Sequence, residues 1–554
     1  MRGSLLGLAL DSGTGDIAIA AQDGGPRLLD AGRAAQLIAA RDASNVSVRW
    51  VWWSEEVCQV LLRLGVRPGR VLDLAQAHLL LEGGSNASPD RIWCDAHGLD
   101  PAQIPAQHRG DLFDSPDEIT DLTDPAQLLD SRGYLRPGFV AAKEGAAVGW
   151  AALAVKAAHA QSDRLRSRPR ALATAYSESG AGVLALELQR EGLPVHRGTL
   201  ETLIEASAGP RPNNGREEQA ARAARDADVL RCIPPGRTVD LRNPEQVLEL
   251  LRSLGIRVES TRKWELQNHR GTHPVIEAVL RWRAHERIAT TYGWNWLDHH
   301  VGSDDRLRGR WHSFDGGAGR MTAEAGLHNL PTVLRAAVLA EPGHVFVRAD
   351  LGQIEPRVLA VVSGDPSLIT ATEQPDLYSS VATQLGVDRP VAKVAMLSAM
   401  YGGAGGQAAA ALQGLDRSYP RAMAYLRCAQ TAGEDGRSVT THGGRLVLVP
   451  PSADQGQARA RGRFARNAVV QGAAAELFKA WALTTRHSTA VFDARIVLCL
   501  HDELLVHVRE EHAAEAAAGV DQALQDAARR WSAGSPVRFV SDTAVIRCWA
   551  DAKP

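Results

Sequence analysis

Two short segments of this 554-residue chain place acidic side chains where metal chemistry could occur. The first, residues 344–350, alternates apolar and polar residues and closes on Asp350. The second, residues 495–508, has two apolar runs that flank His501, Asp502 and Glu503. Two adjacent acids inside an apolar hairpin are costly unless a cation compensates their charge, and a divalent metal would do so. The alternative is a solvent-exposed turn that is acidic by chance.

A third segment, residues 388–403, carries cations and an aromatic ring at four-residue intervals. The side chains that recur in this way are Arg389, Lys393, Leu397 and Tyr401. On a helix they would form one slowly drifting stripe of two cations, an apolar side chain and a ring. A triphosphate followed by a stacked base would meet those chemistries in that order. The alternative is an amphipathic helix whose Leu397 and Tyr401 pack into the core.

Strands and helices must hold these side chains in place. The alternation before Asp350 predicts a strand, and the residues from 353 onward predict a helix with Ile354, Val358 and Val361 on one face. Asp350 would then project from the rigid end of a strand. Residues 495–508 predict a buried β-hairpin with the polar triplet at its turn.

The three segments resemble motifs A, B and C of the family A (DNA polymerase I-type) polymerases. In that family the motifs read D-x-S-Q-I-E-x-R, R-x3-K-x7-Y-G and H-D-E, and here they begin in the same order at Asp350, Arg389 and His501. The resemblance covers about residues 170 to 554, and several matches in register make coincidence improbable. Shorter supporting matches contain Arg320, Asn329, Arg463, Asn467, Gln471 and Trp549.

The resemblance implies a DNA-directed DNA polymerase that adds deoxynucleotides to a primer 3′-hydroxyl by two-metal nucleotidyl transfer. Asp350 and Asp502 would hold two Mg²⁺ ions, for which Mn²⁺ could substitute, and the backbone carbonyl of Leu351 would be a further ligand. Lys393 would be catalytic as a general acid toward pyrophosphate. Glu503 would be a supporting residue. The expected partners are primer–template DNA and deoxynucleoside triphosphates.

The resemblance also implies two sets of binding residues. Glu355 beside Tyr401 would crowd a ribose 2′-hydroxyl, and Arg389 with Lys393 would grip the phosphates. The expected nucleotide-binding residues are Gln353, Glu355, Arg389, Lys393, Leu397 and Tyr401. The expected DNA-binding residues, near the primer end and in the minor groove, are Arg320, Asn329, Arg463, Asn467, Gln471 and His501.

Three positions depart from the family pattern. Leu397 stands where relatives usually have Phe or Tyr, under the incoming sugar, so we expect altered sugar discrimination and weaker nucleotide binding. Gly352 replaces the usual Ser, and Pro356 follows Glu355 where Leu is common. None of these changes removes an expected metal ligand.

The expected fold is an α/β N-terminal exonuclease-like (ribonuclease H-like) domain followed by an α+β right-hand polymerase with palm, fingers and thumb. Residues 1–165 would form a degenerate 3′–5′ exonuclease-like domain and residues 166–300 a mostly helical thumb. Residues 301–370 would form the first part of the palm with motif A. Residues 371–440 would form the fingers with motif B, and residues 441–554 the second part of the palm with motif C.

The N-terminal segment lacks the acids that a proofreading exonuclease needs. Only Asp11 follows the first expected strand, Val57 stands where an Asp is expected, and residues 140–160 contain neither Tyr nor Asp. We therefore expect a catalytically inactive domain kept as a scaffold. Because the chain begins directly at this fold, we expect no 5′-nuclease either.

Composition and charge limit the class of protein. Apolar residues make up 45% of the chain and charged residues 23%, which excludes a mostly disordered protein. The formal net charge is −2, whereas residues 381–480 hold twelve basic and six acidic side chains, a net +6. A local basic block suits a phosphate-binding surface, although a solvated face is the alternative.

Cysteine usage and hydropathy bear on the compartment. Six scattered cysteines without a C-x-x-C pair fit a reducing compartment, and the chain shows no apolar run long enough for a signal peptide or a membrane span. We expect a cytoplasmic, nucleoid-associated bacterial protein that acts as a monomer in replication or repair.

Two other functions compete with DNA synthesis. A single-subunit RNA polymerase shares the palm design, but the pairing of Glu355 with Tyr401 argues against ribonucleotide use. A non-catalytic DNA-binding factor could keep the fold, but intact Asp350, Asp502 and Lys393 argue against it. Primer extension with deoxynucleotides and with ribonucleotides would separate these alternatives.

Overall fold

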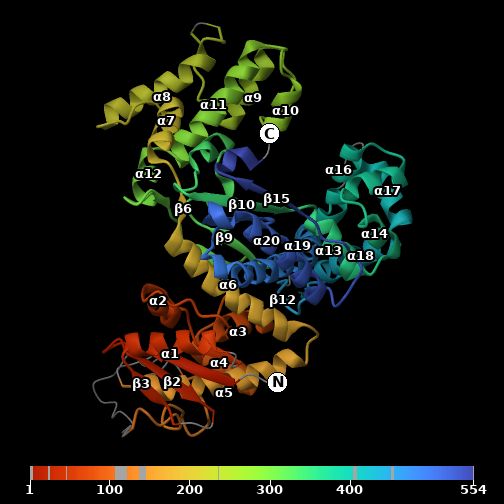
Figure 1. Cartoon of the computed structure of the whole chain (residues 1–554). Coiled ribbons are helices and arrows are strands. Elements are labelled where there is room, and N and C mark those ends of the chain that lie inside the picture. The colour runs from red at the N-terminus through yellow and green to blue at the C-terminus, as the bar shows by residue number, and fades with distance from the viewer. Residues whose placement is uncertain are drawn as a thin grey trace. The chain divides into compact units, whose positions relative to one another are not determined.

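The computed structural model describes residues 4–22, 25–44, 47–105, 121–136, 145–234, 236–403, 408–450 and 455–552. By compactness the chain divides into two units (Figure 1). The first unit comprises Met1–Arg190, Trp311–Thr322 and Val347–Val545. The second comprises Glu191–Arg310, Ala323–Phe346 and Ile546–Pro554. The five domain ranges proposed from the sequence stay a prediction.

The N-terminal part of the first unit is built on a five-stranded mixed sheet. Its strands are β1 (Ser4–Leu10), β2 (Ile17–Ala21), β3 (Arg27–Leu29), β4 (Val48–Trp52) and β5 (Val71–Asp73). The order is β3-β2-β1-β4-β5, with β1, β4 and β5 parallel and β2 antiparallel to β1 and β3. Alternate residues of β1 and β4 enter two different apolar clusters, so the sheet is buried on both faces.

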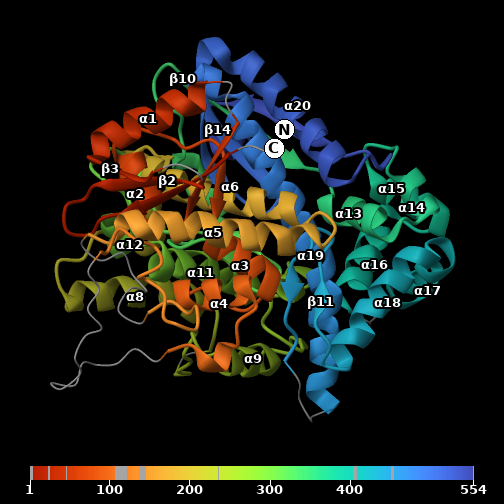
Figure 2. The ribbon, with the colours of Figure 1, turned by 90° about the horizontal axis from the view of Figure 1, so that it is seen from below.

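Helices cover both faces of this sheet. On one face lies α5 (Ala147–Arg166), and on the other lie α1 (Ala31–Ala43) and α2 (Glu56–Arg63) (Figure 2). A Cβ atom at Gly7 of β1 would lie 2.0 Å from the backbone oxygen of Ala151. Only glycine therefore allows α5 to approach the sheet this closely. The other helices of this part are α3 (Leu74–Glu82), α4 (Pro89–His97) and α6 (Ala171–Glu191).

The second sheet of the first unit carries two of the three chemical segments. Its order is β13 (Arg495–Cys499), β14 (Glu503–Arg509), β10 (His344–Leu351) and β15 (Ser541–Ile546). The strand before Asp350 and the hairpin of residues 495–508 are thus confirmed. Two long helices, α19 (Gln455–Ser488) and α20 (Ala513–Trp531), pack against each other and against the hairpin.

A helical region of the first unit holds the remaining segment. Its helices are α13 (Ile354–Ser363), α14 (Pro366–Ala371), α15 (Leu377–Leu385), α16 (Arg389–Tyr401), α17 (Ala408–Ser418) and α18 (Pro420–Glu434). The helices α16, α17 and α18 pack side by side (Figure 2). The predicted helix α16 is confirmed, and it ends at Gly402 with a left-handed φ of 74°.

The second unit is mostly helical, as the spacing of its apolar residues predicts. Its helices are α7 (Arg197–Ala208), α8 (Gly215–Leu230), α9 (Pro244–Ser253), α10 (Lys263–Asn268), α11 (Pro274–Thr291) and α12 (Trp294–His300). The charged residues 210–228 fall mainly on α8, whose side chains are largely solvated. Valine, leucine and isoleucine side chains from residues 229–282 form the core beneath α9, α10 and α11.

The described residues form no disulfide bond and no membrane-spanning helix. All six cysteines carry free thiols. Within the described ranges, no helix has both the length and the apolar character needed to cross a membrane.

Candidate active site

Asp350 and Asp502, about 150 positions apart in the sequence, lie at the same end of the second sheet, where β10 ends and β14 begins. The backbone N–H of Leu351, next to Asp350, donates a hydrogen bond to the backbone oxygen of Asp502 at 2.6 Å. The side chain of Asp350 is 17% exposed, and Asp502 is exposed in the turn between β13 and β14. The end of β10 and the hairpin turn therefore bring the backbones of Asp350 and Asp502 close together, although only Asp502 is among the residues that line the cavity described below.

A buried arginine compensates the acids in this region. The Arg348 guanidinium lies 2.5 Å from Asp350 Oδ2, 2.9 Å from Glu503 Oε2 and 3.1 Å from Asp542 Oδ2, and its side chain is 1% exposed. Although burial opposes it, the charge of Glu503 and Asp350 raises the pKa of Arg348. The sequence reasoning missed Arg348. Its position two residues before Asp350, on the same face of a strand, was the available indication.

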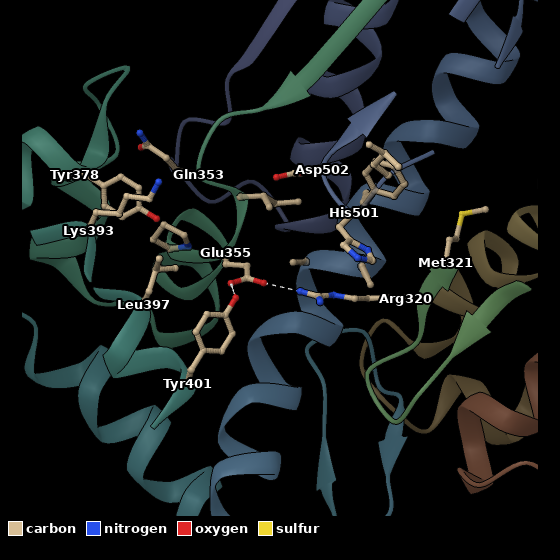
Figure 3. Close-up of a pocket in the computed structure, with 16 residues that line it drawn as sticks. Arg320, Met321, Gln353, Glu355, Tyr378, Lys393, Leu397, Tyr401, His501 and Asp502 are labelled. Carbon is tan, nitrogen blue, oxygen red and sulfur yellow. Dashed lines mark hydrogen bonds and ion pairs between the residues drawn. The ribbon is translucent and has the colours of Figure 1, made fainter. Parts of the chain in front are cut away.

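Eight predicted site residues line one cavity of about 440 Å³ in the first unit. Figure 3 shows side chains from α16 on one side of this cavity and those of His501 and Asp502 on the other. The predicted residues are Arg320, Gln353, Glu355, Lys393, Leu397, Tyr401, His501 and Asp502. Residues that the sequence reasoning did not assign also line it, among them Met321, Tyr378 and Phe478.

Glu355 is held from two sides inside the cavity. Arg320, at the start of β9 (Arg320–Ala323), donates to Glu355 Oε1 at 2.7 Å, and the Tyr401 hydroxyl donates to Oε2 at 2.5 Å (Figure 3). Burial and the hydrogen bond to Glu355 raise the pKa of Tyr401 to about 12, so its hydroxyl stays protonated at neutral pH. Burial, together with the nearby charge of Arg320, lowers the pKa of His501.

The predicted stripe along α16 is only partly directed into the cavity. Lys393, Leu397 and Tyr401 line it, whereas Arg389, one turn earlier, is not among its lining residues. Instead Arg389 Nε donates to Asp376 Oδ2 at 2.6 Å and Nη2 donates to Oδ1 at 3.2 Å. The alternative of a stripe packed into the core does not hold, because Lys393 and Tyr401 are exposed and Leu397 is half-buried.

Asp376 connects motif A to α16. Besides Arg389, the Asp376 carboxylate accepts from Gln353 Nε2 at 2.6 Å and from Ser379 Oγ at 2.5 Å. The hydrogen bond from Arg389 is the main reason that the pKa of Asp376 lies well below its usual range. Gln353 Oε1 in turn accepts from the N–H of Leu377 at 2.8 Å. Asp376 is a second residue that sequence reasoning missed, because it lies between motifs A and B and in neither.

Three expected DNA-binding residues lie four positions apart on α19, namely Arg463, Asn467 and Gln471. Gln471 makes a side-chain hydrogen bond with Tyr401. Asn467 Oδ1 is buried and has no hydrogen-bond partner among the described residues. Asn329 lies in the second unit, where its backbone oxygen accepts from Arg287 at 2.6 Å and Tyr292 at 2.9 Å.

The acids of the N-terminal sheet are already hydrogen-bonded. The Asp11 carboxylate is 1% exposed and accepts from the backbone N–H groups of Gly13, Thr14 and Gly145. Asp73 accepts from Trp52 Nε1 at 2.9 Å and from a backbone N–H at the start of α3, and burial raises its pKa to about 6. Val57 is buried in the core beneath α2. Residues 140–144 of the third expected exonuclease motif lie outside the described residues.

The donor set at the sheet edge suits a hard divalent cation. Two carboxylates, from Asp350 and Asp502, and the backbone carbonyl of Leu351 are oxygen donors of the kind that Mg²⁺ prefers. No cysteine lies among the residues that line the cavity. The residues present therefore fit a magnesium site better than a zinc site.

Comparison with known proteins places the chain in a family. The sequence profile described as "DNA polymerase family A" matches residues 221–551, which is more than half of the chain. The chain belongs to DNA polymerase family A. The match contains Asp350, Asp502 and every cavity-lining residue. The resemblance to family A that the sequence indicated is therefore confirmed.

Curated relatives of this family A chain share its polymerase segment. A thermostable DNA polymerase I of Thermus filiformis is 29% identical over 329 residues, covering 53% of this chain and 38% of the relative. A DNA polymerase I of Chloroflexus aurantiacus is 29% identical, covering 44% and 29%. DNA polymerase theta of Caenorhabditis elegans is 27% identical, covering 53% and 19%. The alignments thus span well under half of the length of each relative.

A solved structure extends the likeness to the whole fold. It is described as the POL domain of Pol1 from M. smegmatis in complex with DNA primer–template and dNTP. The TM-score is 0.67 at 22% sequence identity, over 99% of this family A chain and 96% of that chain. The two chains therefore share a fold.

Proposed function

We propose that this chain is a template-directed DNA polymerase that extends a primer 3′-hydroxyl with deoxynucleotides. The observation that carries the proposal is the backbone hydrogen bond between Leu351 and Asp502, which joins the end of β10 to the β13–β14 turn beside the cavity that Asp502 and Lys393 line. Membership of DNA polymerase family A supports the same activity. The proposed substrates are deoxynucleoside triphosphates, and the proposed macromolecular partner is primer–template DNA.

Asp350, Asp502 and the backbone carbonyl of Leu351 would hold two Mg²⁺ ions. When bound there, such ions supply charge neutralisation of phosphoryl oxygens and a lowered pKa of a coordinated hydroxyl. Arg348, whose guanidinium lies 2.5 Å from Asp350 Oδ2, would orient the Asp350 carboxylate in this proposal. Glu503 would support the site by sharing Arg348.

The side chains of α16 would act on the triphosphate. Lys393 lies on the cavity wall, where its ammonium group can bind phosphate oxygens and give a proton to the pyrophosphate leaving oxygen. Arg389 would bind phosphate through the N–H groups that Asp376 leaves available, since only Nε and Nη2 are engaged. Both roles are electrostatic, and in phosphoryl transfer positioning and charge supply most of the catalysis.

The wall formed by Glu355 and Tyr401 would select deoxyribose. Their 2.5 Å hydrogen bond fixes both side chains, and Arg320 fixes the other carboxylate oxygen. Because both side chains are held, neither Glu355 nor Tyr401 can easily rotate away from a ribose 2′-hydroxyl. This feature favours DNA synthesis over the RNA polymerase alternative.

Primer extension with Asp350→Ala and Asp502→Ala tests the proposal. We expect each substitution to lower the extension rate by more than about 100-fold, beyond the effect typical of residues that only orient a ligand. Affinity for primer–template should change little. Asp163→Ala, which removes a 78% exposed carboxylate, is the matched control and should extend as the wild type does. Normal extension by either test variant would exclude its residue from the site.

We further infer that residues 1–165 form a degenerate 3′–5′ exonuclease-like, ribonuclease H-like domain without nuclease activity. The strand order β3-β2-β1-β4-β5, with a single parallel group of β1, β4 and β5, supports the fold. The hydrogen bonds that engage Asp11 and Asp73 support the inactivity, because their carboxylates already serve as backbone caps. The thumb, fingers and palm ranges given above belong to the same proposal, as do the expected monomer and nucleoid association.

A further inference from the structure

We propose that the second unit carries a separate binding site for an unpaired nucleotide of a nucleic-acid strand, centred on Trp264. Tryptophan is seldom left in water, yet this side chain on α10 is 60% exposed. It lines an open pocket of about 710 Å³ together with Arg252 and Arg257. Nothing in the proposed polymerase mechanism uses this pocket, so the inference goes beyond that function.

Hydrogen bonds and core packing hold the loop that forms the pocket. Glu265 Oε2 accepts from the backbone N–H of Ser260 at 3.0 Å and from its hydroxyl at 2.5 Å, which closes the loop before α10. Arg283 of α11 donates to both the backbone oxygen and the hydroxyl of Thr261. Beneath the pocket, Val258 and Leu266 are buried in the core. The indole ring therefore stands on a fixed platform, which lowers the entropy cost of stacking a ligand on it.

Charge around the ring selects an anionic ligand. Residues 252–270 contain five basic and two acidic side chains. Four of the cations, Arg252, Arg257, Arg262 and Lys263, make no ion pair within the part of the chain that the structure describes. The carboxylate of Glu265 is turned to the loop N–H groups, so it offsets little of this charge.

An exposed aromatic ring between unpaired arginines suits a nucleobase with flanking phosphates. A base can stack on the indole while the phosphates on either side reach Arg252 and Arg257. A protein partner would need a broader apolar patch, whereas the remaining lining side chains are charged or buried. A duplex offers no free base face to the ring except at its ends.

Binding of fluorescent 15-nucleotide oligo(dT) and oligo(rU) to the full chain, without nucleotide or primer, tests the site. We expect Trp264→Ala to weaken both complexes about tenfold and Trp264→Phe to weaken them much less. Arg252→Ala/Arg257→Ala should also weaken them and reduce their salt dependence. The matched control, Arg33→Ala/Arg529→Ala, removes two exposed arginines of the first unit and should bind as the wild type does.

Two further arms separate this site from other nucleic-acid-binding surfaces. On an oligonucleotide of abasic residues, Trp264→Ala should bind as the wild type does, whereas the double arginine variant should still be weaker. Photo-crosslinking of a 5-bromouracil oligonucleotide should label the tryptic peptide of residues 264–270. Unchanged oligonucleotide affinity for Trp264→Ala, or the absence of crosslinks in this peptide, would overturn the proposal. Neither result depends on extension activity, so failure here leaves the polymerase proposal standing.

Discussion

Two carboxylates outside the expected metal site are each bonded to side chains that line the cavity. Glu355 is fixed by Arg320 and Tyr401, and Asp376 is fixed by Gln353 and Arg389. Each acid is thus bonded to side chains from different segments of the chain. We therefore expect Glu355 and Asp376 to orient the nucleotide and its binding residues rather than to take part in the chemical step. Separate measurements of KM and kcat distinguish these two roles.

Shortening Glu355 should relax sugar discrimination. Glu355→Ala removes the carboxylate held by Tyr401 and opens space on the cavity wall, so we expect the preference for deoxynucleotides over ribonucleotides to fall about 10- to 100-fold. The ratio of kcat/KM for each pair of nucleotides measures the effect. Glu355→Gln keeps the bulk of the side chain and should retain most of the preference. An unchanged ratio for Glu355→Ala would show that another group excludes the 2′-hydroxyl.

Removing the Asp376 carboxylate should weaken nucleotide binding. Asp376→Ala leaves Arg389 and Gln353 without the acceptor that orients them, so we expect the nucleotide KM to rise about tenfold with a smaller change in kcat. Primer–template affinity should stay the same. Asp388→Ala is a matched control, because Asp388 is an exposed acid that precedes the same helix and makes no capping bond with its side chain. A lower KM would show instead that Asp376 competes with the triphosphate for Arg389.

At the scale of elements, a buried ionic cluster joins α6 to α19. Glu178 of α6 accepts from Lys479 Nζ at 2.6 Å and lies 2.8 Å from Arg445 Nη2. One turn before Lys479 on α19, Glu476 accepts from the hydroxyl of Thr441 and from the N–H of Gly443, the latter at 2.8 Å. Burial raises the pKa of Glu476 to about 7, so this acid titrates near neutrality.

The stability of the chain should therefore depend on Glu476 between about pH 4.5 and 7. Because folding raises its pKa from 4.5 to about 7, the native state binds more protons than the unfolded state in this window. Its contribution to the free energy of unfolding thus falls as pH rises and is constant above the window. Glu476→Gln can still accept from the Gly443 N–H while its amide N–H donates to the Thr441 hydroxyl oxygen, so it should match the wild type near pH 4.5 and exceed it by up to about 3 kcal/mol at pH 8.

Denaturant unfolding at pH 4.5, 6, 7 and 8 would measure this difference. Glu515→Gln, which changes an exposed glutamate on α20, should show no such pH trend relative to the wild type. A constant difference between Glu476→Gln and the wild type at every pH would mean that Glu476 is ionised across the whole range.

The elements that hold the site could be predicted because their patterns are local. Alternation marks β10, paired apolar runs mark the β13–β14 hairpin, and four-residue spacing marks α16. The partners of those side chains could not be predicted in the same way. Arg389 was expected to face phosphate, but the structure shows it hydrogen-bonded to Asp376, thirteen positions earlier. Such a pairing depends on how α15 and α16 pack, which periodicity does not encode.

Across the whole molecule, the acidic side chains of the N-terminal sheet and those of the polymerase segment have different surroundings. In the polymerase segment Asp502 and Glu355 line the cavity, whereas the N-terminal sheet uses Asp11 and Asp73 as caps of its own backbone. Sequence alone showed that exonuclease acids were missing. It did not show that the remaining acids are engaged, because that depends on contacts between distant segments such as the bond from Gly145 to Asp11.

We expect the chain to lack 3′–5′ proofreading. Purified wild-type protein, incubated with Mg²⁺ and a primer that ends in a mismatch but without nucleotides, should leave the primer at full length. The same preparation should extend a matched primer when nucleotides are added, which shows that it is active. Shortening of the mismatched primer would contradict the proposal. In that case, Asp350→Ala should shorten it equally if the nuclease lies in the N-terminal domain.

The single guanidinium of Arg348 has a consequence for how the protein matures. Asp350, Glu503 and Asp542 lie close together and would repel one another without a counter-ion. Arg348, on the same strand as Asp350, supplies that positive charge. This end of the sheet can thus form without a bound cation. At the proposed magnesium site, metal binding would then follow folding rather than drive it.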